Sequence, residues 1–350
     1  MKWLKTISIV LLAMVALLCL LLGLATLADF KPGPKETAET WGNSPAIQIT
    51  DSVFSILSWN LGYFGLGKDA DFFYDGGKMT RPAEADYLRY ASQALKYLGR
   101  MKKADFYIFQ EVDMKAARSY DDDQVARLRG IFPSMESSFT VNYQVSFVPM
   151  PLRNPMGHVK SGLVSFSSFQ TMENTRYAFP GGYTWPVRLF MLDRCFLLSR
   201  ISLPGGKELV LINTHNEAFD DGSQRKQQMA VLKNLMLDEY EKGNYIVTGG
   251  DWNQNPVGYS TGKFSNSDVG RNIEPAIEPD FFPEDWQWVF YPEIPTNRDV
   301  NQAYQKGKTH TTIIDFFVVS PNVEVLEIKT KDLGFEWSDH QPVEMRFGIK

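Results

Sequence analysis

Polar side chains that could activate a water molecule follow a short apolar run late in the chain. Residues 245–248 are rich in β-branched side chains and predict a buried strand, after which Gly249 and Gly250 allow a sharp turn. Asp251 and Asn253 come next, and the alternation of side chains along an extended chain puts both on one face. A carboxylate beside an amide suits activation of a water next to a phosphate. A turn that only caps the strand is the alternative for this tetrapeptide alone.

Other predicted strands also end in, or carry, polar residues of the kinds that a phosphate-cleaving site uses. They are Asn60 after residues 53–59, Glu111 after 104–109, His215 after 208–213, Asp315 within 312–319, and Asp339 with His340 before 343–347. Each of them alone is as well explained as a turn residue or the start of a loop. Together, in this order, they predict a site at the strand ends.

Asp315 stands out because its neighbours, residues 312–319, are almost entirely apolar. A buried carboxylate without a partner costs several kcal/mol, so this strand requires a nearby cation or hydrogen-bond donor. Arg194 opens another predicted strand, a position at which an arginine is often a surface charge.

The elements that must position these residues alternate between strand and helix patterns. Apolar residues recur at helical spacing in 81–101 and again in 223–240, between the predicted strands. The 350 residues contain 44% hydrophobic and 22% charged residues, which is ordinary for a globular protein. With no linker in mid-chain, the pattern predicts one α/β domain.

The net charge and the cysteine content argue against some classes of protein. The net charge of -5 argues against a large basic surface for nucleic acid, although a nuclease needs only a local basic groove. Cys19 and Cys195 are the only cysteines, and Cys19 lies in the N-terminal apolar run. The two cysteines therefore cannot form a disulfide framework within the domain, and the apolar core must stabilise the fold.

The N-terminal 28 residues differ from the rest of the chain. Lys2 and Lys5 precede residues 6–28, which contain no charged residue and are long enough to cross a bilayer. We expect 1–28 to be a membrane anchor, with a cleaved signal sequence as the alternative, and 29–49 to be an extended linker. With the lysines held inside, the following domain lies on the extracytoplasmic side of the cell membrane, or is secreted if the segment is cleaved.

The order and neighbours of the polar strand ends resemble the endonuclease/exonuclease/phosphatase superfamily, the deoxyribonuclease I-like fold. The matching words are Ser58-Trp59-Asn60, Gln110-Glu111, Ser161-Gly162-Leu163, Asn213-Thr214-His215, Gly250-Asp251-Trp252-Asn253, Ile314-Asp315-Phe316 and Ser338-Asp339-His340-Gln341-Pro342. The likeness covers about residues 50–348. It implies a four-layer α/β sandwich of two packed mixed β-sheets flanked by helices, as one catalytic domain over 50–350 behind the N-terminal transmembrane helix.

The resemblance also implies roles for the site residues. Glu111 would bind Mg²⁺, or Mn²⁺ in its place, with Asn60 and Asp339 positioning the ion or its waters. Asp251, oriented by Asn253, would take the proton from the attacking water, and His215 would protonate the leaving group. His340, held by Asp315, and Arg194 would contact the phosphate.

A histidine at the position of His215 occurs in family members that resemble deoxyribonuclease I, neutral sphingomyelinases and inositol-phosphate phosphatases. The resemblance therefore implies a Mg²⁺-dependent phosphoester hydrolase, which the predicted N-terminal anchor would tether to the membrane. A lipid headgroup is the first substrate hypothesis, favoured by the anchor and by aromatic loops around 179–185 and 280–291. An extracellular nuclease is the alternative, and a non-catalytic binding module is a third. The oligomeric state is left open.

Overall fold

Two seven-stranded sheets form the body of the molecule in the structure, a computed structural model that describes residues 2–42, 52–101, 103–260, 264 and 277–350. The first sheet has the order β1 (Lys35–Thr37), β7 (Glu173–Ala178), β8 (Cys195–Ser202), β9 (Glu208–His215), β10 (Tyr245–Asp251), β14 (Asp315–Val319) and β11 (Gln287–Val289). The second has the order β15 (Val323–Thr330), β16 (Val343–Ile349), β3 (Val53–Asn60), β4 (Phe106–Ala116), β6 (Gly157–Ser167), β5 (Glu136–Val148) and β2 (Glu39–Trp41).

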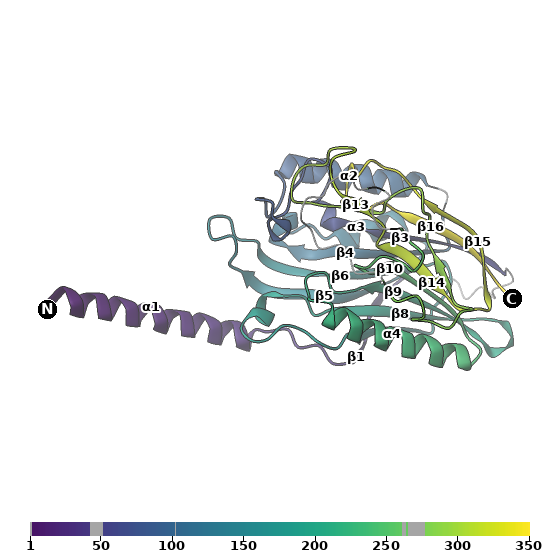
Figure 1. Cartoon of the computed structure of the whole chain (residues 1–350), viewed down its shortest axis with the longest axis horizontal. Coiled ribbons are helices and arrows are strands. Elements are labelled where there is room, and N and C mark those ends of the chain that lie inside the picture. The colour runs from purple at the N-terminus through teal and green to yellow at the C-terminus, as the bar shows by residue number, and fades with distance from the viewer. Residues whose placement is uncertain (1, 43–51, 102, 261–263, 265–276) are drawn as a thin grey trace.

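The helices cover the outer faces of these sheets (Figure 1). α2 (Glu84–Arg100) and α3 (Gln124–Ile131) pack on the second sheet through one apolar cluster, and α4 (Ser223–Glu241) packs on the first sheet through another. A third cluster, with Phe106, Ile108, Leu211, Val247 and Phe317, fills the space between the two sheets. The order helix, sheet, sheet, helix confirms the predicted four-layer sandwich, because each sheet buries two apolar faces.

Short elements complete the chain. They are the pair β12 (Asn297–Arg298) and β13 (Thr311–Thr312), and the 3₁₀ turns η1 (Gly62–Phe64), η2 (Phe73–Asp75), η3 (Ala117–Ser119), η4 (Val187–Phe190) and η5 (Pro204–Gly206). The N-terminal helix α1 (Lys2–Leu27) leaves the body as a separate rod (Figure 1). It is apolar and long enough to cross a membrane, and its hydrophobic side chains are exposed.

Strand register brings the polar strand ends together. β9 and β10 are parallel, with His215 opposite Asp251, and β14 runs antiparallel to β10, with Asp315 also opposite Asp251. In the other sheet β3 and β4 are parallel, with Asn60 opposite Gln110. Parallel neighbours end at the same edge of a sheet, so both sheets present their polar ends on one side of the sandwich.

The structure differs from two expectations about the backbone. Gly249 and Gly250 lie inside β10 and do not form a turn. A Cβ on Gly250, whose φ is +140°, would lie 2.0 Å from the carbonyl oxygen of Thr214, so glycine is needed for the close approach of β9 and β10.

The expected linker also has a structural part. β1 pairs with β7 of one sheet and β2 pairs with β5 of the other, so this segment bridges both sheets. The end of that linker, 43–49, the expected start of the catalytic domain, 50–51, and residues 261–263 and 265–276 lie outside the described residues.

Candidate active site

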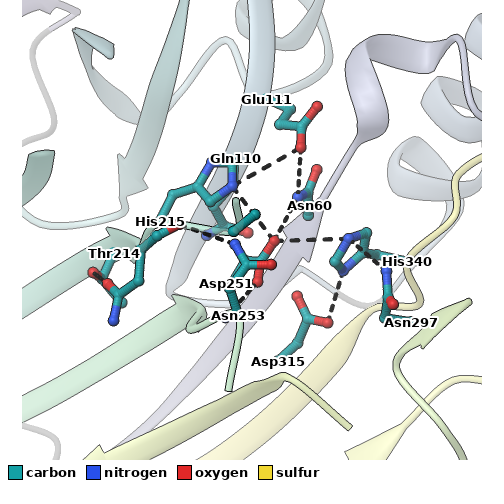
Figure 2. A network of polar contacts seen from close by, with 12 residues as sticks. Asn60, Gln110, Glu111, Thr214, His215, Asp251, Asn253, Asn297, Asp315 and His340 are labelled. Carbon is teal, nitrogen blue, oxygen red and sulfur yellow. Dashed lines mark hydrogen bonds and ion pairs between the residues drawn. The ribbon is translucent and has the colours of Figure 1, made fainter. Parts of the chain in front are cut away.

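The Asp251 carboxylate lies at the centre of the polar strand ends (Figure 2). Its Oδ2 accepts a hydrogen bond from the Asn60 amide at 2.9 Å, and the Nε2 atoms of His215 and His340 lie 3.5 and 3.7 Å from the same oxygen. Burial raises the pKa of Asp251 to about 6, against the opposing effect of His340. A carboxylate with a pKa near neutrality is suited to accept a proton from water.

Asn253 orients Asp251 through its backbone and not through its side-chain amide. Its backbone N–H donates to Asp251 Oδ1 at 3.0 Å, whereas its side-chain amide donates to the backbone oxygen of Asn216. The side chain therefore fixes the loop after β10, and the backbone fixes the carboxylate. Asn253 has a φ of +50°, a left-handed conformation that asparagine tolerates better than most residues.

Glu111 reaches the site because β4 is irregular at this point. The pairing of β4 with β6 shifts register between Phe109 and Val112, and Glu111 has a φ of +52°. A bulge of this kind turns a side chain away from the regular alternation of a strand. Glu111 Oε1 accepts from the Asn60 amide at 3.1 Å and lies 3.9 Å from His215 Nε2.

Asn60 links the two carboxylates. Its Oδ1 accepts the Gly62 N–H at 2.9 Å, so its Nδ2 faces Glu111 and Asp251. In this arrangement Asn60 positions the carboxylates, and its oxygen is engaged by the backbone. Gly62 is itself crowded, because a Cβ there would lie 2.6 Å from Asp339 Oδ1.

His340 has the partner that the buried Asp315 requires. Its Nδ1 lies 2.8 Å from Asp315 Oδ2, and Asp315 is fully buried. Burial lowers the pKa of His340, but Asp315, Asp251 and Asp339 together raise it well above its usual range. The Asn297 Nδ2 atom lies 2.9 Å from Nε2 on the other side of the ring.

The pKa of His215 shifts in the opposite direction from that of His340. Its Nδ1 is buried with no hydrogen-bond partner among the described residues. Burial lowers its pKa well below the usual range, and Arg194, His340 and Arg118 lower it further. The ring is therefore neutral in the free protein at neutral pH.

The donor atoms fit a hard divalent cation. Glu111, His215 and Asp251 each offer an atom within 4.8 Å of the other two. Burial raises the pKa of Asp339 to about 7, and the negative charge of Glu111 contributes to the increase. Buried carboxylates that repel one another are stabilised by a cation, and carboxylate oxygens are the ligands that Mg²⁺ prefers.

Four arginines, Arg118, Arg194, Arg225 and Arg298, line the cleft of about 650 Å³ into which these residues open. Arg194 is 6% exposed, and its only close acidic partner among the described residues is Glu217, 3.5 Å from Nε. Its Nε and Nη1 have no hydrogen-bond acceptor there. A buried guanidinium with unused donors is suited to bind phosphate oxygens.

Arg118 is a cleft residue that sequence reasoning missed. It pairs with Asp113 at 2.9 Å and lies 3.9 Å over the ring of Tyr63. Asn297, which contacts His340, and Tyr63, whose hydroxyl is buried without a partner in the described chain, were also missed. No periodic pattern or motif marks these residues, because they lie in 3₁₀ turns and in the two-residue strand β12.

Comparison by sequence found no matching family model and no matching curated protein. Comparison by structure found several similar proteins. An endonuclease/exonuclease/phosphatase from Beutenbergia cavernae DSM 12333 matches with a TM-score of 0.55 and 16% identity over 85% of this chain and 72% of its own.

Two further structures match over nearly their whole length. TDP2 from D. rerio, in complex with a single-strand DNA product, has a TM-score of 0.52 and 16% identity over 85% of this chain and 100% of its own. ANGEL2, a 2',3'-cyclic phosphatase in complex with adenosine-2',3'-vanadate, has a TM-score of 0.53 and 15% identity over 90% and 99%. These matches confirm the predicted resemblance: this chain has the endonuclease/exonuclease/phosphatase fold.

Proposed function

We propose that the protein is a metal-dependent phosphoester hydrolase in which Asp251 activates the attacking water. The observation that carries this proposal is the position of the Asp251 carboxylate, with a histidine 3.5 Å away on one side and 3.7 Å away on the other. Its pKa of about 6 lets it accept a proton near neutral pH. The similar solved structures, which include a phosphatase, support the same class of reaction.

The two histidines take different parts in the reaction. His340, kept protonated by Asp315, supplies a fixed positive charge to the phosphoryl oxygens, together with Arg194. His215 donates the proton to the leaving oxygen. Because its pKa is depressed in the free protein, it must take up this proton when an anionic phosphoester enters the cleft and offsets the charges of Arg194 and Arg118.

Glu111 would hold the metal ion, with Asn60 and the nearby Asp339 positioning the ion or its waters. Mg²⁺ is the expected ion and Mn²⁺ the alternative, because both prefer oxygen ligands. When bound, the ion would offset negative charge on the phosphoryl group.

Hydrolysis of bis-p-nitrophenyl phosphate by the full chain tests the proposal. EDTA should abolish the reaction, and Mg²⁺ should restore it, because the carboxylates cannot compensate phosphoryl charge by themselves. Full activity in excess chelator would exclude the metal role. No hydrolysis of any phosphoester in a broad panel would favour a binding module.

Glu111→Gln tests the metal site directly. The variant should bind Mg²⁺ more weakly, so its activity should need a higher Mg²⁺ concentration, and its thermal stabilisation by Mg²⁺ should decrease. Glu84→Gln, on the exposed surface of α2, is the matched control. Equal Mg²⁺ dependence of the two variants would remove Glu111 from the site.

The substrate hypothesis is a lipid headgroup, with nucleic acid as the alternative. A candidate membrane span precedes the domain, and the cleft contains both arginines and apolar side chains. The D. rerio TDP2 structure with a DNA product keeps the nuclease alternative open. Assays against sphingomyelin, phosphatidylcholine, inositol phosphates and plasmid DNA discriminate between them, and cleavage of DNA alone would exclude the lipid substrate.

The proposed location is the outer face of the cell membrane, with α1 as a single uncleaved span and residues 50–350 as the catalytic domain. Lys2 and Lys5 at the start of α1 favour this orientation. Protease added to intact cells should digest the domain, and carbonate washing should leave the untreated protein in the membrane. A protected domain would reverse the orientation, and a shortened soluble product would identify a cleaved signal.

A further inference from the structure

The end of α1 nearest the domain contacts one particular segment of the body, residues 180–191. The indole N–H of Trp185 donates to Thr26 Oγ1 at 3.1 Å, and Arg188 pairs with Asp29 just after the helix. Asp29 and Phe30 also share a small cavity with Gly181 and Tyr183. The candidate membrane span is therefore attached to this face of the domain by side-chain contacts as well as by the chain.

Exposed apolar side chains gather beside this attachment point. In the 180–191 segment, Trp185 is 56% exposed and Val187 is 49% exposed. The connection between β5 and β6, residues 149–156, carries Met150 and Leu152, which is 82% exposed. This connection projects from the body toward the side from which α1 leaves it (Figure 1).

The two segments belong to one surface. The Tyr143 hydroxyl of β5 donates to the backbone oxygen of Phe190, and the backbone N–H of Asp193 donates to the oxygen of Asn142. The active-site cleft opens between them, because Met156 of one segment and Phe190 of the other line it together with His215. The apolar rim of the cleft thus adjoins the attachment of α1.

We propose that residues 149–156 and 180–191 form a membrane-contact surface that holds the mouth of the cleft against the bilayer in which α1 is embedded. This inference rests on the proposed hydrolase function and assigns its substrate class: a phosphoester carried by a membrane lipid. The headgroup enters the cleft while the lipid tails stay in the bilayer next to Trp185 and Leu152.

Continuity with α1 is the reason for choosing a bilayer as the occupant. A span that ends at Leu27 places Trp185 and Arg188, its neighbours, at the level of the membrane interface, where tryptophan and arginine are favoured. Neither 149–156 nor 180–191 contains an acidic residue, and Arg153 adds positive charge. The two segments themselves therefore place no negative charge against anionic headgroups.

A fluorescent probe on the full chain tests the surface without depending on activity. In a Cys19→Ser background, Cys195 stays unlabelled because it is buried, so Leu152→Cys can carry an environment-sensitive dye. Leu326→Cys, 45% exposed on β15, is the matched control. In vesicles of phosphatidylcholine and phosphatidylserine, the dye at position 152 should shift to the blue and be quenched by spin-labelled lipid, and the dye at position 326 should not. Equal emission at the two positions would contradict the proposed membrane-contact surface.

Activity then separates this inference from the proposed function. Leu152→Glu should lower hydrolysis of vesicle phospholipid about tenfold, because a charge replaces an inserted apolar side chain. It should leave hydrolysis of bis-p-nitrophenyl phosphate unchanged, and Leu326→Glu should change neither. A wild-type protein that cleaves the soluble diester but no vesicle lipid would overturn the substrate class. A protein that cleaves neither the soluble diester nor the vesicle lipid, but whose dye at position 152 enters the bilayer, would contradict the proposed function and still support the membrane-contact surface.

Discussion

The two histidines on either side of Asp251 are nearly equally buried, yet their pKa values shift in opposite directions. His215 is 2% exposed and His340 is 5% exposed. Burial lowers the pKa of both, so burial cannot explain the difference. The positive charges of Arg194, His340 and Arg118 lower the pKa of His215 further, whereas the carboxylates of Asp315, Asp251 and Asp339 raise the pKa of His340.

In the proposed mechanism this difference in pKa gives one residue type two functions in one site. A histidine that stays charged supplies a permanent positive charge, and a neutral histidine is free to gain and lose a proton during the reaction. The position of each histidine relative to the strands determines which of the two is charged. His215 ends β9 beside the arginines of the cleft, and His340 precedes β16 and points back to β14.

Asp251→Asn should have the largest effect, because it removes the carboxylate that both histidines face. Loss of the proposed general base should lower kcat/KM for bis-p-nitrophenyl phosphate about 10³-fold. Asp238→Asn, on the exposed face of α4, is the control. A variant that keeps more than a tenth of the wild-type activity, with an unchanged circular dichroism spectrum, would exclude Asp251 as the base.

His215→Ala should have the next largest effect, and its size should depend on the leaving group. An alkyl diester needs a proton on its leaving oxygen, so its hydrolysis should fall about 10²-fold or more. A p-nitrophenolate leaves without protonation, so its release should change less than about tenfold. Equal losses with both substrates would assign another role to His215.

Asp315→Asn should move the pH dependence of activity and not only its size. Asp315 raises the pKa of His340, so its removal should lower that pKa. Activity that requires the imidazolium is lost as the pH rises through this pKa, and the alkaline limb of the pH–rate profile should therefore shift to lower pH by about 1–3 units. An unshifted limb, with lower activity at every pH, would indicate a purely structural role for Asp315.

His215→Gln should have the smallest effect, on stability in mild acid. The folded pKa of His215 is depressed, so below about pH 6.5 the unfolded chain binds a proton that the folded protein does not. Wild-type stability then falls with decreasing pH by up to about 1.4 kcal/mol per unit from this residue. Urea unfolding in EDTA at pH 7.5 and 5 should show a smaller loss for the variant. Identical losses would contradict the depressed pKa.

Local sequence was sufficient to predict much of the site. Asn60, His215 and Asp251 each follow a recognisable apolar strand, and Asp315 is conspicuous as a charge inside one. Strand patterns carry this information because side chains alternate and buried segments exclude charge. The four-layer architecture came from the resemblance that these residues support, and the structure confirms it.

Other features depend on contacts between segments far apart in the chain. No local pattern predicts the bulge that turns Glu111 toward Asn60, or the close approach of Gly250 to Thr214. Arg118 comes from the 3₁₀ turn η3 and Asn297 from the two-residue strand β12, and contacts with distant segments set their positions. The attachment of Trp185 to Thr26 joins a loop to the N-terminal helix across most of the first half of the chain.

The sequence by itself determined which chemical groups the strand ends deliver and that an apolar segment precedes them. Only the tertiary structure decided the charge on each histidine and the direction in which the cleft opens. The physical reason is that a pKa depends on burial and on the charges within a few ångströms, which for His340 come from β14, β10 and the loop before β16. Those distances exist only when both sheets have packed face to face.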